Sequence, residues 1–357
     1  MESKLIYGIQ QIGVGVDNAH KAFEWYATRF GTDISVFEDN NVATHMAPYM
    51  GGVPHKKRAI LALNMQGGSG YEFWQYLDRE PVKPETDIKV GDLGINIGFI
   101  KSRNLEKTYS RLKELNENIL TEIGAEPDSI KSFYIKDPYG NLLKIKESNS
   151  WYSSNGGDTG GTYGCSIGVS NIDKSLKLYK GILGYDQVVY DSTGFFKDLH
   201  GLPNGDKKFR RILLTHKDNR TGGFSKLFGE SQIELIQSLE NEPKKIFSDR
   251  FWGDLGFIHL CFDVNNFKAL HLECQEKGFP FKVMSEESFD MGDANGHWGY
   301  IEDPDGTLIE FVQTNKVTVI KKLGLNIDLT KRDPKKPLPN WMIKSLNFNR
   351  VKKFNYY

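Results

Sequence analysis

The feature that most constrains this fold is an internal repeat, in which two kinds of strand–helix unit each occur twice along the chain. Residues 9–31 (IQQIGVGVDNAHKAFEWYATRFG) are similar to residues 165–185 (CSIGVSNIDKSLKLYKGILGY), and residues 93–116 are similar to residues 255–278. In the first kind, alternating apolar residues predict a strand, and the Asp or Asn that follows predicts the start of an amphipathic helix. Repeated units indicate an architecture built by packing copies of one module together.

Further strands follow each of the four units. The second kind of unit leads into a hairpin whose turn reads Asp-Pro-Tyr-Gly at residues 137–140 and Asp-Pro-Asp-Gly at residues 303–306. Proline and glycine at these places are typical of a β-turn. The chain is therefore predicted to contain four strand–helix–strands modules, which we name A (from residue 9), B (from residue 93), A′ (from residue 165) and B′ (from residue 255).

The order of the modules along the chain predicts two halves joined by a linker. We expect the first half at residues 5–150 (modules A and B), a Gly/Ser-rich linker at residues 151–163 and the second half at residues 164–315 (modules A′ and B′). The remaining residues 316–357 form a basic tail outside the repeat. We expect this tail to pack on the body through Trp341, Met342, Ile343 and Leu346.

Charge and cysteine content exclude several classes of protein. Lys+Arg and Asp+Glu number 46 each, and this balance argues against a protein that binds nucleic acid or anionic membranes through its whole surface. The start MESKLIYG has no signal-peptide pattern, and no stretch reaches the roughly 18 apolar residues of a membrane span. We therefore expect a cytoplasmic protein. Three cysteines form no CxxC motif and are expected to be free, buried thiols. They are Cys165, Cys261 and Cys274.

A βαβββ module used in pairs resembles the vicinal oxygen chelate superfamily, which includes glyoxalase I, extradiol dioxygenases and bleomycin-type antibiotic-resistance proteins. The resemblance covers residues 5–315, and its most specific parts are the strand FIHLCFDV and the hairpin DPDGTLIEFVQ. It implies an α+β fold in which four βαβββ modules pair into two curved, eight-stranded mixed sheets. Because this fold supports many reactions, the function must be inferred from the site.

The resemblance also implies two site positions in each module, one in its first strand and one in its last. We assign Gln11 and Glu72 in A, Asn96 and Lys144 in B, Ser166 and Glu234 in A′, and His259 and Glu310 in B′.

Two ways of pairing the modules give different metal sites. If A pairs with B′, the site is Gln11, Glu72, His259 and Glu310, and every unsuitable residue falls in the other site. If A′ pairs with B′, the set is Ser166, Glu234, His259 and Glu310. The first arrangement is favoured because its order of ligands looks like the zinc site of a glyoxalase I, and His259 and Glu310 belong to both.

The resemblance implies one divalent metal ion (Zn, Ni, Co, Mn or Fe) and proton abstraction next to a carbonyl. Glu310 is then the expected base and Glu72 the group that returns the proton. Strand alternation places Trp74 on the face of Glu72, and we also expect His297 near the substrate. Residues Gly15, Tyr76 and Leu255 stand where glyoxalase I binds glutathione, so another small oxygenated substrate is expected.

The sequence thus predicts a metal-dependent glyoxalase-like lyase, isomerase or epimerase that acts on a small molecule as a monomer or homodimer. Two alternatives stay open. An Fe(II) ring-cleaving dioxygenase requires two histidines and a carboxylate, but the eight assigned positions hold one histidine. A metal-free binding or resistance protein would carry non-ligands at the site positions.

Overall fold

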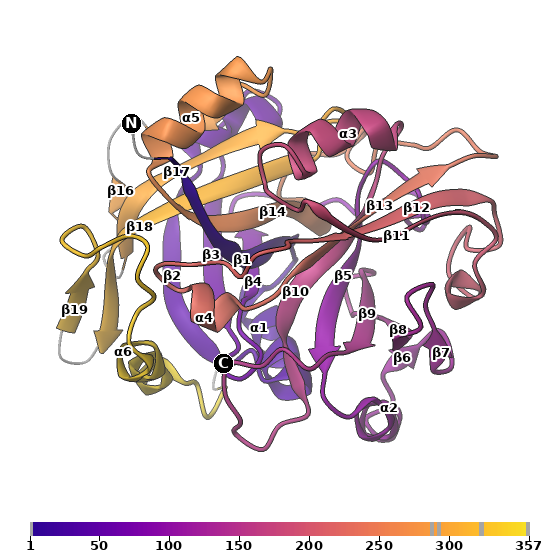
Figure 1. Cartoon of the computed structure of the whole chain (residues 1–357), viewed down its shortest axis with the longest axis horizontal. Helices are drawn as coiled ribbons and strands as arrows, with labels where there is room; N and C mark the ends of the chain where they lie inside the picture. Colours follow the sequence, from indigo (N-terminus) through magenta and orange to yellow (C-terminus); the bar gives the residue numbers. More distant parts are fainter. Residues whose placement is uncertain (1–2, 286–288, 291–293, 321–324, 355–357) are drawn as a thin grey trace.

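The strands form two mixed sheets that lie side by side (Figure 1). The computed structural model describes residues 3–285, 289–290, 294–320 and 325–354. The first sheet has the order β15-β17-β18-β14-β1-β4-β3-β2, and β16 and β19 pair with β17 and β18. The second has the order β11-β12-β13-β10-β5-β9-β8-β6, and β7 pairs with β8. The main path of each sheet thus contains the predicted eight strands, and the α+β prediction is confirmed.

The bounds of the elements follow the predicted modules. The first sheet contains β1 (Leu5–Gly15), β2 (Ile34–Val42), β3 (Lys56–Leu63), β4 (Gly70–Tyr76), β14 (Gly256–Asn265), β15 (Val283–Met284), β16 (Phe289–Asp290), β17 (Ala294–Glu302), β18 (Leu308–Ile320) and β19 (Leu325–Asp328). The second contains β5 (Gly94–Ser102), β6 (Asn118–Ile119), β7 (Gly124–Ala125), β8 (Lys131–Lys136), β9 (Leu142–Glu147), β10 (Thr159–Gly168), β11 (Gln187–Gly194), β12 (Phe209–Thr215) and β13 (Gln232–Ser238). The helices are α1 (Ala19–Phe30), α2 (Leu105–Glu114), α3 (Ile172–Tyr179), α4 (Ser225–Phe228), α5 (Phe267–Glu276) and α6 (Asn340–Ser345), with short 3₁₀ turns η1 (Thr44–Tyr49), η2 (Lys197–Leu199) and η4 (Leu346–Asn349).

Each sheet joins modules from opposite ends of the chain. Strand β1 of module A pairs antiparallel with β14 of module B′, and β5 of module B pairs with β10 of module A′. The prediction that A pairs with B′ is therefore confirmed, and each sheet draws on both predicted halves. Strand β10 begins at Thr159, within the segment expected to be a linker.

The module helices begin in the same way. Asn18, Asn104, Asn171 and Asn266 each accept a hydrogen bond from a backbone N–H of the first helical turn. This side-chain cap satisfies a donor that the helix itself leaves free, so the recurring asparagine fixes where each helix starts.

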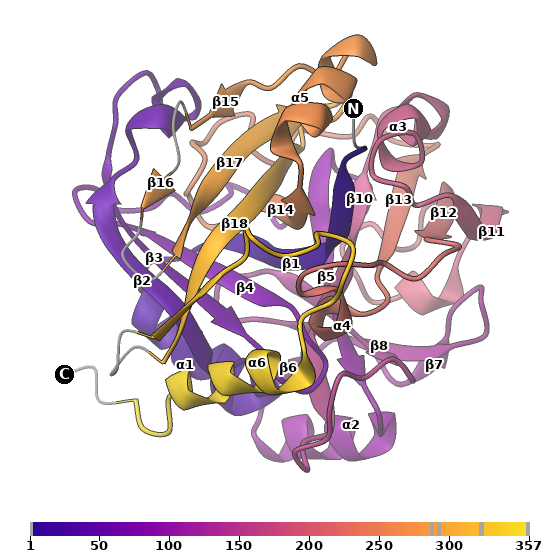
Figure 2. The ribbon, with the colours of Figure 1, turned by 60° about the vertical axis from the view of Figure 1, so that its left-hand side comes forward.

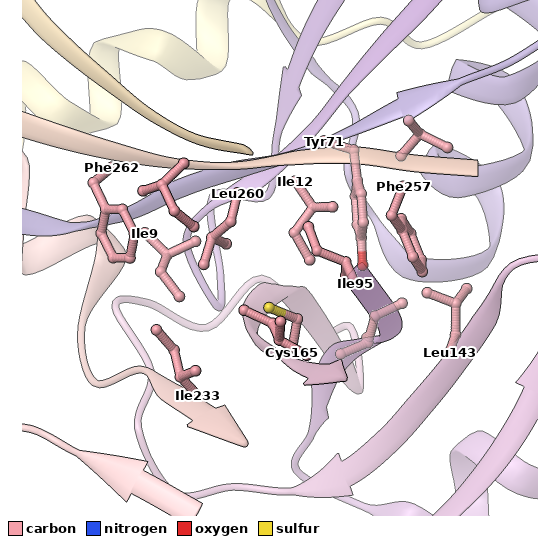
Figure 3. Close-up of a cluster of buried hydrophobic side chains, with 14 of the residues drawn as sticks. Ile9, Ile12, Tyr71, Ile95, Leu143, Cys165, Ile233, Phe257, Leu260 and Phe262 are labelled. Carbon is pink, nitrogen blue, oxygen red and sulfur yellow. The ribbon is translucent and has the colours of Figure 1, made fainter. Parts of the chain in front are cut away.

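An apolar core fills the space between the sheets (Figure 3). Ile9, Leu260 and Phe262 of the first sheet face Cys165 and Ile233 of the second. Two buried hydrogen bonds repeat across this junction. The Tyr26 hydroxyl of α1 donates to Asp137, and the Tyr179 hydroxyl of α3 donates to Asp303, at 2.8 and 2.9 Å. The turn aspartates seen in the sequence thus tie the helices of one sheet to the hairpins of the other.

The C-terminal tail packs on the first sheet (Figure 2). Ile343 and Leu346 are buried, as predicted, and Met342 is partly buried against the same apolar cluster. Trp341 is 68% exposed, so the expectation that it docks is wrong. It lies on the one-and-a-half-turn helix α6, whose inner side is taken by Ile343. No helix in the described part of the chain is long and apolar enough to span a bilayer, and all three cysteines are free and buried.

Candidate metal centre and its cavity

Three ionisable side chains of the first sheet converge inside its curve. His259 Nε2 lies 3.1 Å from Glu310 Oε2 and 3.5 Å from Glu72 Oε2. One candidate ligand atom from each of the three residues lies within 4.8 Å of the others. They come from β14, β18 and β4, which the order β18-β14-β1-β4 brings together although Glu72 and Glu310 lie far apart in the sequence. Gln11 lies on β1, the strand between them.

A glycine makes room for the imidazole. Gly13 pairs with His259 across the antiparallel ladder and with Glu72 across the parallel one. A Cβ atom at residue 13 would lie 2.3 Å from His259 Cε1, closer than any real contact. The His259 ring also packs against Trp252, with ring centres 6.1 Å apart, and meets Tyr300 edge-on at 5.5 Å. Its position is thus set by packing on every side.

Several donor atoms of this cluster are buried without a hydrogen bond, although His259 lies within ion-pair distance of both carboxylates. Gln11 Oε1, Glu310 Oε2 and both ring nitrogens of His259 make no hydrogen bond of acceptable geometry. Buried polar atoms without hydrogen bonds are costly, and a cation that these atoms could coordinate would offset the cost. One amide oxygen, one imidazole and two carboxylates form a donor set that suits a divalent cation such as Zn, Ni, Co, Mn or Fe. The residues present therefore fit a metal ion.

The electrostatics of the cluster would favour a bound cation. Burial, together with the nearby Glu310, raises the pKa of Glu72 to about 7. Burial alone would raise the pKa of Glu310, but the neighbouring His259, and after it Tyr300 and Cys261, lower it. Burial likewise opposes the charged form of His259, yet Glu310 and Glu72 raise its pKa above the ordinary value. Two carboxylates and one imidazole thus lie together with at most one positive charge among them. A divalent ion would balance their negative charge.

The cluster lies on the wall of a cavity of about 500 Å³. Gln11, Glu72 and Glu310 line it, and Trp74 lines it as predicted from strand alternation. His297 does not line it. His297 lies on the opposite face of β17, with its ring centre 6.0 Å from that of Phe267 in α5, while its neighbour Trp298 faces the cavity. The structure therefore does not bring His297 to the wall of this cavity.

Gln10 and Trp252 line the cavity although the sequence analysis did not indicate them, and Leu346 lines it as part of the predicted tail packing. Gln10 lines the cavity beside Gln11 because a bulge between Ile9 and Gln11 interrupts the alternation of β1. Trp252 comes from the loop before β14, and Leu346 from the tail. The bulge and the loop leave no periodic signal, whereas burial of Leu346 follows from the tail packing that the sequence predicts.

The second sheet holds the other predicted positions, so the alternative set Ser166, Glu234, His259 and Glu310 is divided between the two sheets. Glu234 pairs with Ser166 across the ladder just as Glu72 pairs with Gly13. Ser166 is therefore the counterpart of Gly13, and not of Gln11 as assigned. In β5, Phe99 pairs with Lys144 as Cys261 pairs with Glu310, which makes Ile97 the counterpart of His259. Asn96 instead accepts a hydrogen bond from Gly91 N–H, at 2.7 Å.

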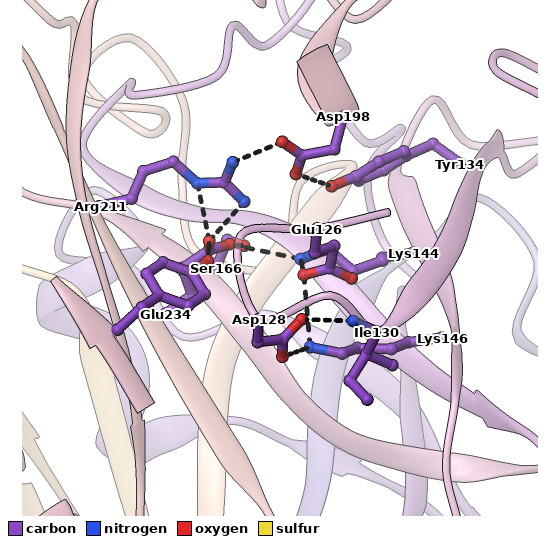
Figure 4. Close-up of polar contacts among 11 residues, drawn as sticks. Glu126, Asp128, Ile130, Tyr134, Lys144, Lys146, Ser166, Asp198, Arg211 and Glu234 are labelled. Atoms are coloured by element: carbon purple, nitrogen blue, oxygen red, sulfur yellow. Dashed lines mark hydrogen bonds and ion pairs between the residues drawn. The ribbon is translucent and has the colours of Figure 1, made fainter. Parts of the chain in front are cut away.

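An ion network occupies this second position (Figure 4). The Glu234 carboxylate pairs with Arg211 at 2.6 Å and with Lys144 at 3.5 Å, and it accepts a hydrogen bond from Ser166. Burial alone would raise the pKa of Glu234, but Arg211 and Lys144 hold it well below its ordinary value. Side-chain cations already take the place that a metal ion would need.

Comparison with known proteins agrees with the fold. Two family models described as the Glyoxalase/Bleomycin resistance protein/Dioxygenase superfamily match residues 8–145 and 165–298. The chain belongs to this superfamily. A search of curated protein sequences finds no match.

Members of this superfamily are also found among similar solved structures. Glyoxalase I from Zea mays is 14% identical with a TM-score of 0.52, over 87% of this chain and 92% of that chain. A "putative dioxygenase" from Bacillus subtilis is 15% identical with a TM-score of 0.56, over 87% of this chain and 86% of that chain. At these identities the likeness supports the fold, and the reaction must be argued from the site.

Proposed function

We propose that this protein is a metal-dependent enzyme that removes a proton from carbon next to a carbonyl group in a small oxygenated compound. The observation that carries the proposal is the cluster of His259, Glu310 and Glu72 at the wall of a cavity, with Gln11 on the strand between them and with buried donor atoms that make no hydrogen bond of good geometry. We expect these four residues to hold one divalent ion. When bound, the ion supplies Lewis-acid stabilisation of the negative charge that develops on the substrate oxygen.

We expect the two carboxylates to transfer the proton. Glu310 on β18 and Glu72 on β4 approach from opposite sides of the central strand pair β14–β1. Glu310 is the expected base, and Glu72 can return the proton from the other side. His259, fixed by Trp252, Tyr300 and the space at Gly13, keeps its place while the carboxylates act.

Aromatic side chains of the cavity wall limit the contact of the cluster with water. Trp74, Trp252 and Tyr300 are all nearly fully buried and surround the cluster. Excluding water strengthens every electrostatic interaction at the reacting atoms. An aromatic wall of this kind favours a substrate with little charge of its own.

The test follows proton exchange directly. The protein is stripped of metal, loaded separately with Zn, Ni, Co, Mn or Fe(II), and incubated in D₂O with 2-hydroxyacetophenone and hydroxyacetone. NMR is expected to show exchange of the protons next to the carbonyl with at least one metal, and Glu310→Gln should reduce it by about 10²-fold or more. Glu24→Gln, at an exposed position on α1, is the control and should leave the rate unchanged.

Exchange that is independent of metal, or that survives Glu310→Gln unchanged, contradicts this proposal. Catechol is added in parallel with the Fe(II)-loaded protein. Oxygen consumption with ring opening there, without proton exchange elsewhere, would support ring cleavage instead. Binding of the ketones with no reaction under any metal would support a binding protein.

A further inference from the structure

The cavity changes character away from the metal cluster. Apolar side chains dominate its remaining wall: Val36, Met46, Leu61, Leu63, Phe228 and Leu346. Lys57 is the one lysine or arginine among the described lining residues, and its ammonium is paired with Asp39. A carboxylate or phosphate on the substrate would find no unpaired cation there, and a neutral apolar group would be well accommodated.

The C-terminal tail completes this apolar wall. The sheet curls so that its edge strand β2 and strand β18 both contact η4, which starts at Leu346. Leu346 is 2% exposed and lines the cavity. The segment thus bridges an opening that the sheet itself leaves between β2 and β18.

The tail is anchored at both ends. After η4, Arg350 pairs with Asp33 at 2.8 Å, and Val351 N–H donates to the Asp33 carbonyl at 2.9 Å. Before α6, Leu338 N–H donates to the Gly223 carbonyl at 2.9 Å, and the Tyr7 hydroxyl donates to the Pro334 carbonyl at 2.9 Å. These contacts hold Leu346 in place as a fixed part of the wall.

We propose that Leu346, held by this C-terminal segment, determines specificity by limiting the length of a neutral apolar group on a compound whose oxygens reach the metal centre. This inference rests on the proposed function for the oxygen-binding end of the compound. It concerns the apolar part of the wall, where Leu346 lies outside the residues matched by the superfamily models. The substrate class is therefore a small, uncharged oxygenated compound with an apolar or aromatic tail.

Hydroxamates provide suitable probes because they chelate divalent ions through two oxygens without requiring turnover. Calorimetry would measure binding of acetohydroxamate and octanohydroxamate to the zinc-loaded protein. A neutral fluorescent probe, N-phenyl-1-naphthylamine, would report on the apolar wall of the metal-free protein. The variants are Leu346→Trp, which fills the cavity, Leu346→Ala, which enlarges it, and Trp341→Ala as an exposed control on the same segment.

Leu346→Trp is expected to weaken octanohydroxamate binding about tenfold or more, a cost of at least about 1.4 kcal/mol, and to leave acetohydroxamate within about twofold. Leu346→Ala should change the preference between the two chain lengths, and Trp341→Ala should change neither affinity. Circular dichroism and unfolding midpoints confirm that each variant is folded.

The outcomes separate the two proposals. If both hydroxamates bind, and Leu346→Trp and Leu346→Ala keep the wild-type preference between the two chain lengths, the role of Leu346 is overturned while the metal centre stands. If neither hydroxamate binds but Leu346→Trp abolishes the fluorescence of the naphthylamine probe, the apolar wall stands and the metal-dependent function fails. If the naphthylamine probe also binds all variants equally, this inference is wrong.

Discussion

Glu72 in the first sheet and Glu234 in the second occupy equivalent positions, yet their surroundings differ completely. Each lies on a strand that runs parallel to the first strand of its own module, opposite Gly13 and Ser166 respectively. Around Glu72 stand another carboxylate and an imidazole, whereas around Glu234 stand Arg211 and Lys144. Burial raises the pKa of the first, and neighbouring cations lower the pKa of the second.

The counterparts of the neighbouring residues explain the difference. Lys144 takes the place of Glu310, Ile97 that of His259, and Arg211 that of Ala59. The cluster in the first sheet therefore carries an excess of carboxylates, which the proposed ion would balance, whereas side-chain cations balance Glu234 in the second sheet. The same backbone holds a candidate binding site in one sheet and an internal ion network in the other.

The largest expected effect comes from breaking the ion network of the second sheet. Arg211→Met or Lys144→Met leaves the fully buried Glu234 without a full complement of cations. The loss in free energy of unfolding should be about 3–5 kcal/mol, measured by urea denaturation. Glu72→Gln in the metal-free protein is the matched change in the first sheet and should cost less than about 1 kcal/mol, because it removes one of two adjacent carboxylates. Equal losses in the two sheets would remove the distinction between them.

A smaller effect is expected at the glycine beside the imidazole. Gly13→Ala should displace His259 and lower metal affinity about tenfold or more, because the added Cβ would lie 2.3 Å from the ring. Competition with a colorimetric zinc chelator measures this affinity. Gly124→Ala, where a Cβ meets nothing within 4 Å, is the control and should bind metal as the wild type does. Unaltered affinity in Gly13→Ala would show that the ring is not held as described.

A third effect concerns Asp263, a buried carboxylate on β14 with neither oxygen hydrogen-bonded. Burial raises its pKa well above the model-peptide value of 3.8. The folded state then binds more protons than the unfolded state, so this group lowers stability as the pH rises from about 4 toward its folded pKa. Asp263→Asn should increase the free energy of unfolding by about 1–3 kcal/mol at pH 7 and much less at pH 4.

The control for this prediction is Asp206→Asn, whose carboxylate is 73% exposed in its ion pair with Lys207 and should have little effect at either pH. A stability gain in Asp263→Asn that is the same at pH 4 and pH 7 would mean that Asp263 is not charged or discharged over this range. A loss of stability would point to a hidden partner for the carboxylate.

The sequence predicts the architecture well because each repeated unit has regularly spaced apolar residues that indicate its strand and its helix. Module order and the favoured pairing brought Gln11, Glu72, His259 and Glu310 to one place, and the structure shows the same four residues on adjacent strands. Two site assignments in the second sheet were wrong because polar residues were chosen without regard to the pairing register of the strands. Asn96 and Ser166 are polar, but the ladders make Ile97 and Gly164 the counterparts of His259 and Gln11.

Other features could not be predicted from periodicity. A bulge in β1 turns Gln10 toward the cavity, and Trp252, from the loop before β14, packs against His259. Arg211 and Lys146, which complete the ion network, look like ordinary strand residues until the curvature of the sheet is known. These contacts depend on three-dimensional curvature, which a one-dimensional pattern does not record.

The most direct test of the central claim is the metal content of the chain. The purified protein is stripped, incubated with excess zinc, dialysed and analysed by inductively coupled plasma mass spectrometry. We predict one ion per chain in the wild type and in Glu234→Gln, and none in His259→Ala or Glu310→Ala. Two ions per chain, none in the wild type, or an ion that persists in His259→Ala would contradict the assignment of one metal centre to the first sheet.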